Sequence, residues 1–257
     1  MTEHKHEQFL ETFTIDGNER AYSASLYFFR CKDAINCSLL RDALHEEERT
    51  KLAGLSFEKR MHDYLLGRYA AKQAIAAIAQ AGRLDEIGIR NGLFRQPIVF
   101  GLRDRAVQTS ITHCDQLGAA IAFDEEMPAG IDIERVEPDR IPMLESRCTS
   151  AEREWARSAP CSGAVALTLI WTSKEAIAKT IKTGFAVSLD LFEVERIERR
   201  EGCWITHYRW FTPFQAVSFA AGQYVCTIAS PKRALIKPDI TRLKELFDWL
   251  PPMSSTR

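Results

Sequence analysis

Gly130-Ile131-Asp132-Ile133-Glu134 is one of two stretches that say most about this chain, and the other is Trp171-Thr172-Ser173-Lys174-Glu175-Ala176-Ile177-Ala178-Lys179. The first stretch alternates apolar and acidic residues, which predicts a strand with both isoleucines on one face and both carboxylates on the other. The second predicts a helix on which Trp171, Glu175 and Lys179 share a face at i, i+4 and i+8.

Three carboxylates, those of Asp132, Glu134 and Glu175, converge with the Lys179 ammonium if this strand and helix meet. Carboxylates so placed repel one another unless a divalent cation lies between them. Oxygen ligands indicate a hard cation such as Mg²⁺, and a neighbouring lysine is typical of a phosphate substrate. A plainer explanation of the first stretch is a strand with a solvated acidic face. A plainer explanation of the second is an exposed Glu/Lys pair that stabilises the helix by about 0.3 kcal/mol. Trp171 on the same face favours an enclosed site.

The composition is that of an ordinary globular protein. The chain has 257 residues, a formal net charge of −1 and 46% hydrophobic residues, which allows one large domain or two small ones. The near-neutral charge argues against nucleic acid or an anionic membrane as a partner. Seven cysteines without a C-x-x-C pair indicate a reducing compartment rather than a zinc site or a disulfide framework. No apolar start or long apolar run is present, so we expect a cytoplasmic protein.

The order of predicted elements indicates an α+β fold with two similar halves related by a pseudo-twofold axis, each a long helix packed on a small, mostly antiparallel sheet. We expect a polar N-terminal extension (1–20), an N-terminal half (21–115), a C-terminal half with the metal site (116–231) and a tail (232–257). The long helices are expected at 56–80 and 163–182. Three runs, 107–113, 118–123 and 129–136, predict a meander in one sheet. Further strands are expected at 21–30, 87–90, 97–100, 187–196, 203–209 and 223–229, a charged helix at 39–55 and a weak helix at 241–250. The middle of the chain would then be an interface where a ligand cleft is common.

His113 and a group of basic residues are candidates for phosphate contacts. His113 ends the first run of the meander, where its imidazole could donate to a phosphate oxygen in the sheet that holds Asp132. The basic group lies on the first two helices, and although most such charges only solvate a surface, together they could bind a polyphosphate. Its members are Arg49, Lys51, Lys59, Arg60 and Arg68.

Together these residues resemble the 4′-phosphopantetheinyl transferase superfamily. Its signature is a G-[IV]-D-[IV]-E strand followed some forty residues later by [FW]-[SCT]-x-K-E-[AS]-x-x-K, and both motifs match at every position. Thr109 to Cys114 is similar to a further family segment, with Thr112 where serine is usual, and Leu65 to Lys72 resembles an arginine-containing one. The family's G-K-P segment is reduced to Arg95-Gln96-Pro97. The length and the two-half plan are similar to the monomeric, surfactin-synthetase type.

The resemblance implies an enzyme that moves the phosphopantetheine arm of coenzyme A to a serine of an apo acyl or peptidyl carrier protein and releases 3′,5′-adenosine bisphosphate. It implies Mg²⁺, or Mn²⁺, held by Asp132, Glu134 and Glu175. Glu175 would accept the serine proton directly or through a water, and Lys179 would stabilise charge on the phosphoryl group.

Coenzyme A contacts are implied for a larger set. His113 would bind the pyrophosphate as a catalytic group, Lys174 is a further phosphate contact, and the remaining members are Arg49, Lys51, Arg60, Arg68, Thr112 and Lys179. The sequence leaves open whether Arg95 or Gln96 replaces the family's lysine, and which carrier is modified. Two alternatives remain: a catalytically inactive coenzyme A-binding regulator or carrier-protein scaffold, and an unrelated magnesium phosphohydrolase.

Overall fold

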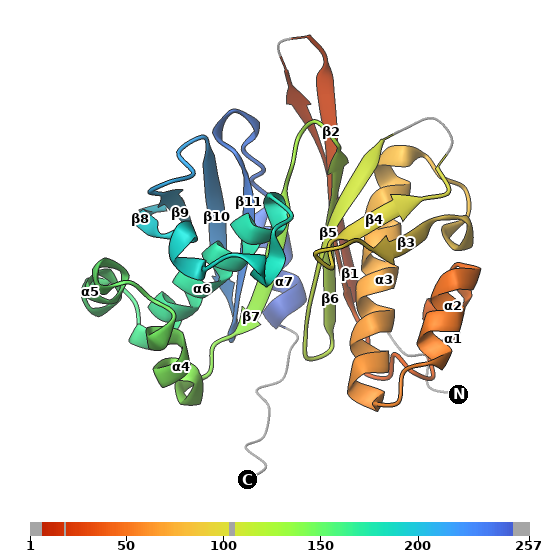
Figure 1. The fold of residues 1–257 in the computed structure, drawn as a ribbon, viewed down its shortest axis with the longest axis horizontal. Helices are drawn as coiled ribbons and strands as arrows, with labels where there is room; N and C mark the ends of the chain where they lie inside the picture. Colours follow the sequence, from red (N-terminus) through yellow and green to blue (C-terminus); the bar gives the residue numbers. More distant parts are fainter. Residues whose placement is uncertain (1–6, 18, 103–105, 249–257) are drawn as a thin grey trace.

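The computed structural model describes residues 7–17, 19–102 and 106–248, and its ribbon is drawn in Figure 1. It has the expected α+β class, with two main antiparallel sheets and one long helix packed on each. The pseudo-twofold relation between the halves stays a prediction.

The first sheet has the strand order β1-β2-β6-β5. Its strands are β1 (Glu7–Asp16), β2 (Ala21–Arg30), β5 (Val107–Cys114) and β6 (Leu117–Asp124). β1 pairs with β2 along its whole length, so half of the predicted N-terminal extension is an edge strand. β6 lies between β2 and β5, so the first sheet extends to residue 124. The predicted division of the chain at residue 115 stays a prediction. A neighbouring two-stranded sheet contains β3 (Gly88–Asn91) and β4 (Pro97–Phe100).

The second sheet has the order β7-β11-β10-β9-β8. Its strands are β7 (Gly130–Arg135), β8 (Val194–Arg200), β9 (Cys203–Tyr208), β10 (Phe214–Ala221) and β11 (Tyr224–Pro231). β10 is a strand that the sequence analysis missed. The strand expected at 187–196 is wrong in its first part, because Leu189–Phe192 forms a 3-10 turn before β8 begins.

The helices follow the predicted order with shorter bounds. The charged segment forms α1 (Ser38–Asp42) and α2 (Glu46–Ala53), and the first long helix is α3 (Glu58–Ala79). α4 (Ile141–Ser146) and α5 (Ser150–Ser158) precede the second long helix, α6 (Gly163–Thr180), and α7 (Ile240–Asp248) follows the last strand. Thr149 and Glu152 form a capping box at the start of α5. No helix in the described ranges is long and apolar enough to cross a bilayer.

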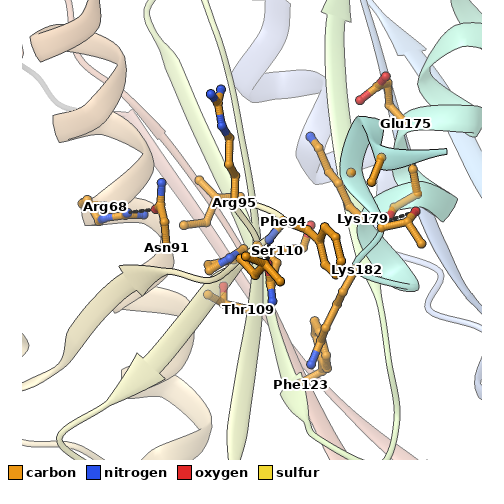
Figure 2. Close-up of a pocket in the computed structure, with 18 residues that line it drawn as sticks. Arg68, Asn91, Phe94, Arg95, Thr109, Ser110, Phe123, Glu175, Lys179 and Lys182 are labelled. Carbon is orange, nitrogen blue, oxygen red and sulfur yellow. Dashed lines mark hydrogen bonds between the residues drawn. The ribbon is translucent and has the colours of Figure 1, made fainter.

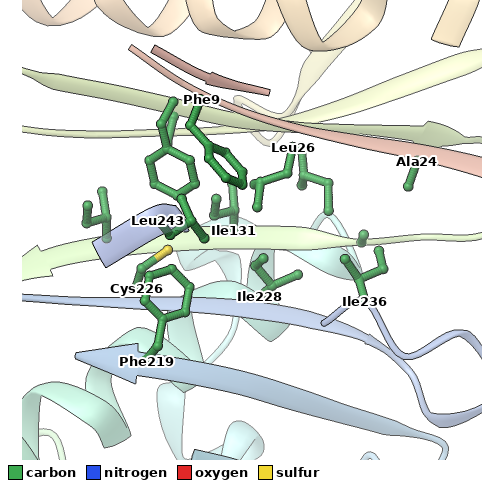
Figure 3. Packing of buried hydrophobic residues seen from close by; sticks show 14 of the residues in the cluster. Phe9, Ala24, Leu26, Ile131, Phe219, Cys226, Ile228, Ile236 and Leu243 are labelled. Atoms are coloured by element: carbon green, nitrogen blue, oxygen red, sulfur yellow. The ribbon is translucent and has the colours of Figure 1, made fainter. Parts of the chain in front are cut away.

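One apolar core joins the two sheets, as Figure 3 shows. Alternate residues of β2 divide between two cores: Leu26 and Phe28 face the second sheet, whereas Tyr27 and Phe29 face α3. Ile131 and Ile133 of β7 enter the shared core from the other side, as the strand prediction required. The acidic face of β7 is therefore turned toward α6, and the alternation of this strand positions the site.

The predicted meander is wrong at its third strand, because β7 pairs with β11 in the second sheet and not with β5 or β6. β5 and β7 still lie beside each other, joined through hydroxyl side chains. The backbone N–H of Ile131 donates to Ser110 Oγ (3.1 Å) and that of Ile133 to Thr112 Oγ1 (3.2 Å). We call this pair of contacts the hydroxyl seam. It brings the end of β5, with His113, close to Asp132 without a continuous ladder between the sheets.

Candidate active site

Close approach of α6 to β7 forms the site, and Gly130 permits it. A Cβ at this position would overlap the carbonyl oxygen of Ala176 and crowd Thr180. The helix therefore lies directly over the strand, with Trp171, Glu175 and Lys179 on the face that meets Asp132 and Glu134.

Each strand carboxylate has a cationic partner. Lys179 Nζ donates to Asp132 Oδ1 (2.7 Å) and to the carbonyl oxygen of Ile131 (3.0 Å). Arg140 donates to Glu134 Oε2 (2.6 Å), and the indole N–H of Trp171 donates to Glu134 Oε1 (3.1 Å). The contact from Trp171 confirms the inference that this aromatic belongs with the charged face. Thr112 Oγ1 also contacts Asp132 Oδ1 at 3.3 Å, so β5 contributes to the same carboxylate.

Glu175 is the carboxylate with the most unusual electrostatics. Burial and, to a smaller extent, the neighbouring Asp132 raise the pKa of its side chain from 4.5 to about 7, while Lys179 acts in the opposite direction. Its Oε1 is buried and accepts no hydrogen bond from any described residue. A glutamate with a pKa near neutrality can both take up and release a proton at physiological pH, which is the property of a general base.

The donor set fits a hard cation, although it does not form a closed cage. Within the described ranges, no group of three or more His, Cys, Asp or Glu side chains is arranged to hold a metal ion. Asp132 Oδ2 and Glu175 Oε1 are nevertheless both buried acceptors that no described donor satisfies. Buried oxygens of this kind are costly unless they gain a partner, and oxygen-rich sites prefer Mg²⁺. Asp132, Glu134 and Glu175 therefore stay the predicted metal ligands.

His113 lies at the edge of this cluster with Asp63 of α3 as its acidic neighbour. Its Nδ1 is 3.8 Å from Asp63 Oδ1. Almost half of the side chain remains accessible (46%), yet partial desolvation lowers the pKa of His113, and Asp63 opposes that shift. The imidazole is thus accessible to a ligand, which fits its predicted role as a phosphate contact.

A cavity of about 500 Å³ opens beside Glu175 and Lys179 and is lined from both halves of the chain. One wall comes from β5 and the turn between β3 and β4, and the other from the end of α6 and the turn that follows it (Figure 2). Among the described residues that line it, Glu175 is the one carboxylate and four side chains are cationic: Arg68, Arg95, Lys179 and Lys182. This excess of positive charge suits a ligand with several phosphates.

The predicted basic residues separate into two groups. Arg68 lines the cavity, is only 7% exposed and is paired with the buried Glu48 (3.4 Å). Lys51 is close to Arg68, since both side chains pack on the ring of Tyr64. Arg49 and Arg60 are exposed and do not line the cavity, so the structure does not bring them together with it.

Lys174 is placed away from the cavity. Its ammonium is 1% exposed and donates to Glu152 Oε2 (2.7 Å) and to the carbonyl oxygen of Arg147. Glu152 in turn accepts from the backbone N–H groups of Thr149 and Val194. The expected phosphate contact is therefore replaced by a structural ion pair between α6 and α5, because Lys174 lies on another face of α6 than Glu175.

The sequence predictions did not include two cationic residues of the site, Lys182 and Arg140, and left the role of Arg95 undecided. Arg95 lines the cavity, whereas Gln96 accepts a hydrogen bond from the Phe94 N–H and supports the turn, so Arg95 is the charged member of this segment. Lys182 lines the cavity just after α6, and Arg140 pairs with Glu134. Arg140 follows its carboxylate by six residues, but no spacing rule connects a strand residue to a 3-10 turn after it.

The comparison with protein-family models matches the segment that contains the site. Residues 128–229 match the model of the 4′-phosphopantetheinyl transferase superfamily. Among solved structures, the chain is similar to a holo-(acyl-carrier-protein) synthase from Bacillus anthracis str. Ames in complex with CoA (3′,5′-ADP), with 20% identity and a TM-score of 0.33 over 46% of this chain and 93% of that chain. A search of curated proteins finds no match.

The matched segment contains β7, α6 and all three carboxylates. The resemblance inferred from the two motifs is therefore confirmed over residues 128–229, which match the model of a phosphopantetheinyl transferase superfamily. The monomeric, surfactin-synthetase subtype stays a prediction.

Proposed function

We propose that this chain transfers the 4′-phosphopantetheine arm of coenzyme A to a serine of an apo acyl or peptidyl carrier protein, in a Mg²⁺-dependent reaction that releases 3′,5′-adenosine bisphosphate. The observation that carries the proposal is the placement of Glu175 and Lys179 at one end of a cationic cavity (Figure 2). A base and an ammonium at that end meet the needs of phosphoryl transfer, and the cavity offers cations to the rest of a polyphosphate donor.

Glu175 takes the proton in the proposed reaction. The serine Oγ–H bond breaks as the proton passes to Glu175, a new bond forms between Oγ and the β-phosphorus, and the bond from that phosphorus to the bisphosphate leaving group breaks. In the metal-free protein burial raises the pKa of Glu175 to about 7. A cation bound beside it would favour the ionised carboxylate, which is the form that accepts the serine proton.

Lys179, Arg95 and His113 stabilise the donor. Lys179 bridges β7 and the cavity, so its charge lies where negative charge develops on the phosphoryl oxygens. Arg95 and His113 lie at the edges of the same region and would contact the pyrophosphate. Asp132, Glu134 and Glu175 would hold Mg²⁺, which when bound supplies charge neutralisation at the pyrophosphate.

The direct test is mass spectrometry of several apo carrier proteins after incubation with the chain, coenzyme A and Mg²⁺. We expect at least one carrier to gain the mass of one phosphopantetheine. The variant Glu175→Gln should lower the rate by at least about 100-fold, since a positioned base contributes roughly 10²–10⁴-fold. Glu154→Gln, an exposed change on α5, is the matched control and should react at the normal rate.

Two outcomes would contradict the proposal. Coenzyme A binding without a mass gain on any carrier would favour the inactive regulator or scaffold. Full activity in Glu175→Gln would remove Glu175 as the base while leaving the transferase assignment intact.

A further inference from the structure

Glu134 differs from the other two predicted metal ligands in how many of its oxygens already have a partner. Arg140 Nη1 donates to Glu134 Oε2 at 2.6 Å, and the indole N–H of Trp171 donates to Oε1 at 3.1 Å. Asp132 Oδ2 and Glu175 Oε1, by contrast, are buried and accept no hydrogen bond from any described residue. A cation between the three carboxylates would therefore meet an unpaired oxygen on Asp132 and on Glu175, but not on Glu134.

A short, constrained segment brings the Arg140 guanidinium to Glu134. Arg140 ends the 3-10 turn Pro138–Arg140, where its backbone N–H donates to the carbonyl oxygen of Glu137 at 3.0 Å. Pro138 fixes φ at the start of this turn, and α4 begins directly after it. The Arg140 side chain is 28% exposed and that of Glu134 is 23% exposed. Because water only partly screens this pair, its charge-assisted bond is stronger than that of an ordinary surface ion pair.

Arg140 also differs from the lysine that pairs with the neighbouring strand carboxylate. Lys179 lines the cavity and leaves Asp132 Oδ2 without a described donor, so that carboxylate keeps an oxygen for another partner. Arg140 is not among the described residues that line the cavity, and its contact completes the occupation of Glu134. The charge of Arg140 is therefore directed at the carboxylate and not at the cavity.

The contact between Arg140 and Glu134 explains why the carboxylates do not gather into a cage. In the described part of the chain, no three His, Cys, Asp or Glu side chains form a group that could hold a metal ion, although α6 lies directly over β7. A guanidinium that holds Glu134 by a charge-assisted bond keeps this carboxylate from joining the other two. A divalent cation must then displace Arg140 to gain Glu134 as a ligand.

We propose that Arg140 is a positioning residue that competes with the divalent cation for Glu134 and thereby lowers the metal affinity of the site. The inference rests on the proposed function, in which Asp132, Glu134 and Glu175 hold Mg²⁺. Three ionised carboxylates attract a divalent cation strongly by themselves. Arg140 offsets part of that negative charge, so the cation is held less tightly than the three carboxylates alone would allow.

Binding of Mn²⁺ alone tests this competition, measured at one fixed pH by the electron paramagnetic resonance signal of the free ion. Arg140→Gln should bind Mn²⁺ about 10-fold more tightly than the wild type, because a positive charge beside the cation is removed. Arg140→Met, a second neutral variant, should do the same. If the ion pair were merely structural, its loss would loosen the site and binding would be weaker or unchanged.

Two charged-residue variants are the controls for this gain in affinity. Arg140→Lys keeps the positive charge and should retain most of the weaker wild-type binding. Arg157→Gln, an exposed change on α5, alters the net charge of the chain as Arg140→Gln does and should leave Mn²⁺ binding unchanged. Tighter binding in Arg157→Gln would mean that overall charge, and not Arg140, sets the affinity.

A double-mutant cycle separates competition for Glu134 from simple repulsion between two cations. Glu134→Gln removes the contested carboxylate and should weaken Mn²⁺ binding. In that background, Arg140→Gln should change the dissociation constant by less than about twofold. An equal gain with and without Glu134 would overturn the competition, and so would Arg140→Gln binding that is no tighter than that of the wild type.

Transfer activity reports separately on the proposed function. The Mg²⁺ concentration for half-maximal transfer should fall in Arg140→Gln in parallel with the dissociation constant for Mn²⁺. If the wild type modifies no carrier, the proposed function fails, whereas Mn²⁺ binding still decides the role of Arg140. If neither the wild type nor Arg140→Gln binds Mn²⁺, that role is refuted.

Discussion

Charge compensation at single residues determines how this site responds to pH. The strand carboxylates Asp132 and Glu134 have Lys179 and Arg140 as partners, whereas burial leaves Glu175 with a pKa raised from 4.5 to about 7. Burial of an ionised carboxylate is unfavourable, so the folded protein holds the proton of Glu175 more tightly than the unfolded chain does.

Stability without metal should therefore fall as the pH rises. The folded pKa of Glu175 lies above the unfolded value, so its stabilising contribution is full below about pH 4.5 and is lost as the pH rises through about 7. The size is at most about 3 kcal/mol, from about 1.4 kcal/mol per pKa unit. Urea unfolding between pH 5 and pH 8 in a chelator should show this decrease, and Glu175→Gln should reduce it. A pH slope identical in the two proteins would contradict the assignment.

Among the elements, contact between α6 and β7 decides whether the site forms at all. Gly130 lets the helix backbone reach the strand, and the three predicted metal ligands all belong to one of these two elements. The motif glycine is therefore a packing requirement and not a ligand.

Gly130→Ala should separate α6 from β7. Because the added Cβ would overlap backbone at Ala176, which cannot rotate away, we expect a loss of about 1–3 kcal/mol in the free energy of unfolding and a large loss of transfer activity. Gly163→Ala is the control on the same helix, since open space surrounds that position and alanine favours a helix. Urea denaturation would measure the free energy of unfolding of both variants. Equal stability of Gly130→Ala and the wild type would show that α6 and β7 are not in tight contact at this position.

At this scale the sequence predicted much of the fold. Period-two alternation placed Asp132 and Glu134 on one face of β7, and helical spacing placed Trp171, Glu175 and Lys179 together. It failed where pairing is non-local: the alternation of β7 does not reveal that its partner is β11, almost a hundred residues later. It also failed for Lys174, because a motif position does not show which neighbouring helix supplies a buried partner such as Glu152.

For the molecule as a whole, the shared core implies that both halves unfold together. Phe28 of β2 is fully buried and packs edge-on against Phe247 of α7, with ring centroids 5.8 Å apart. α7 in turn contacts β1 and β10, which belong to different sheets. Each sheet buries the apolar residues of its inner face by packing against the other sheet.

Phe28→Ala tests this cooperativity. All five tryptophans follow residue 150, so their fluorescence reports on the C-terminal half, although Phe28 lies in the first sheet. We expect a loss of about 3–5 kcal/mol, seen equally by tryptophan fluorescence and by circular dichroism. The exposed Leu39→Ala should cost little. A tryptophan transition unchanged by Phe28→Ala would mean that the halves unfold independently.

The hydroxyl seam joins the two sheets through side-chain hydrogen bonds and not through a strand ladder. Ser110 and Thr112 of the first sheet accept hydrogen bonds from the backbone of β7 in the second sheet. The chain passes from the first sheet to the second once, in the segment between β6 and β7 that contains the exposed residues Glu125 and Glu126. A break between these two glutamates interrupts no strand ladder and leaves each long helix with its own sheet. The protein is thus arranged so that two separately made fragments could assemble into one enzyme, with a cavity that exists only once both are present.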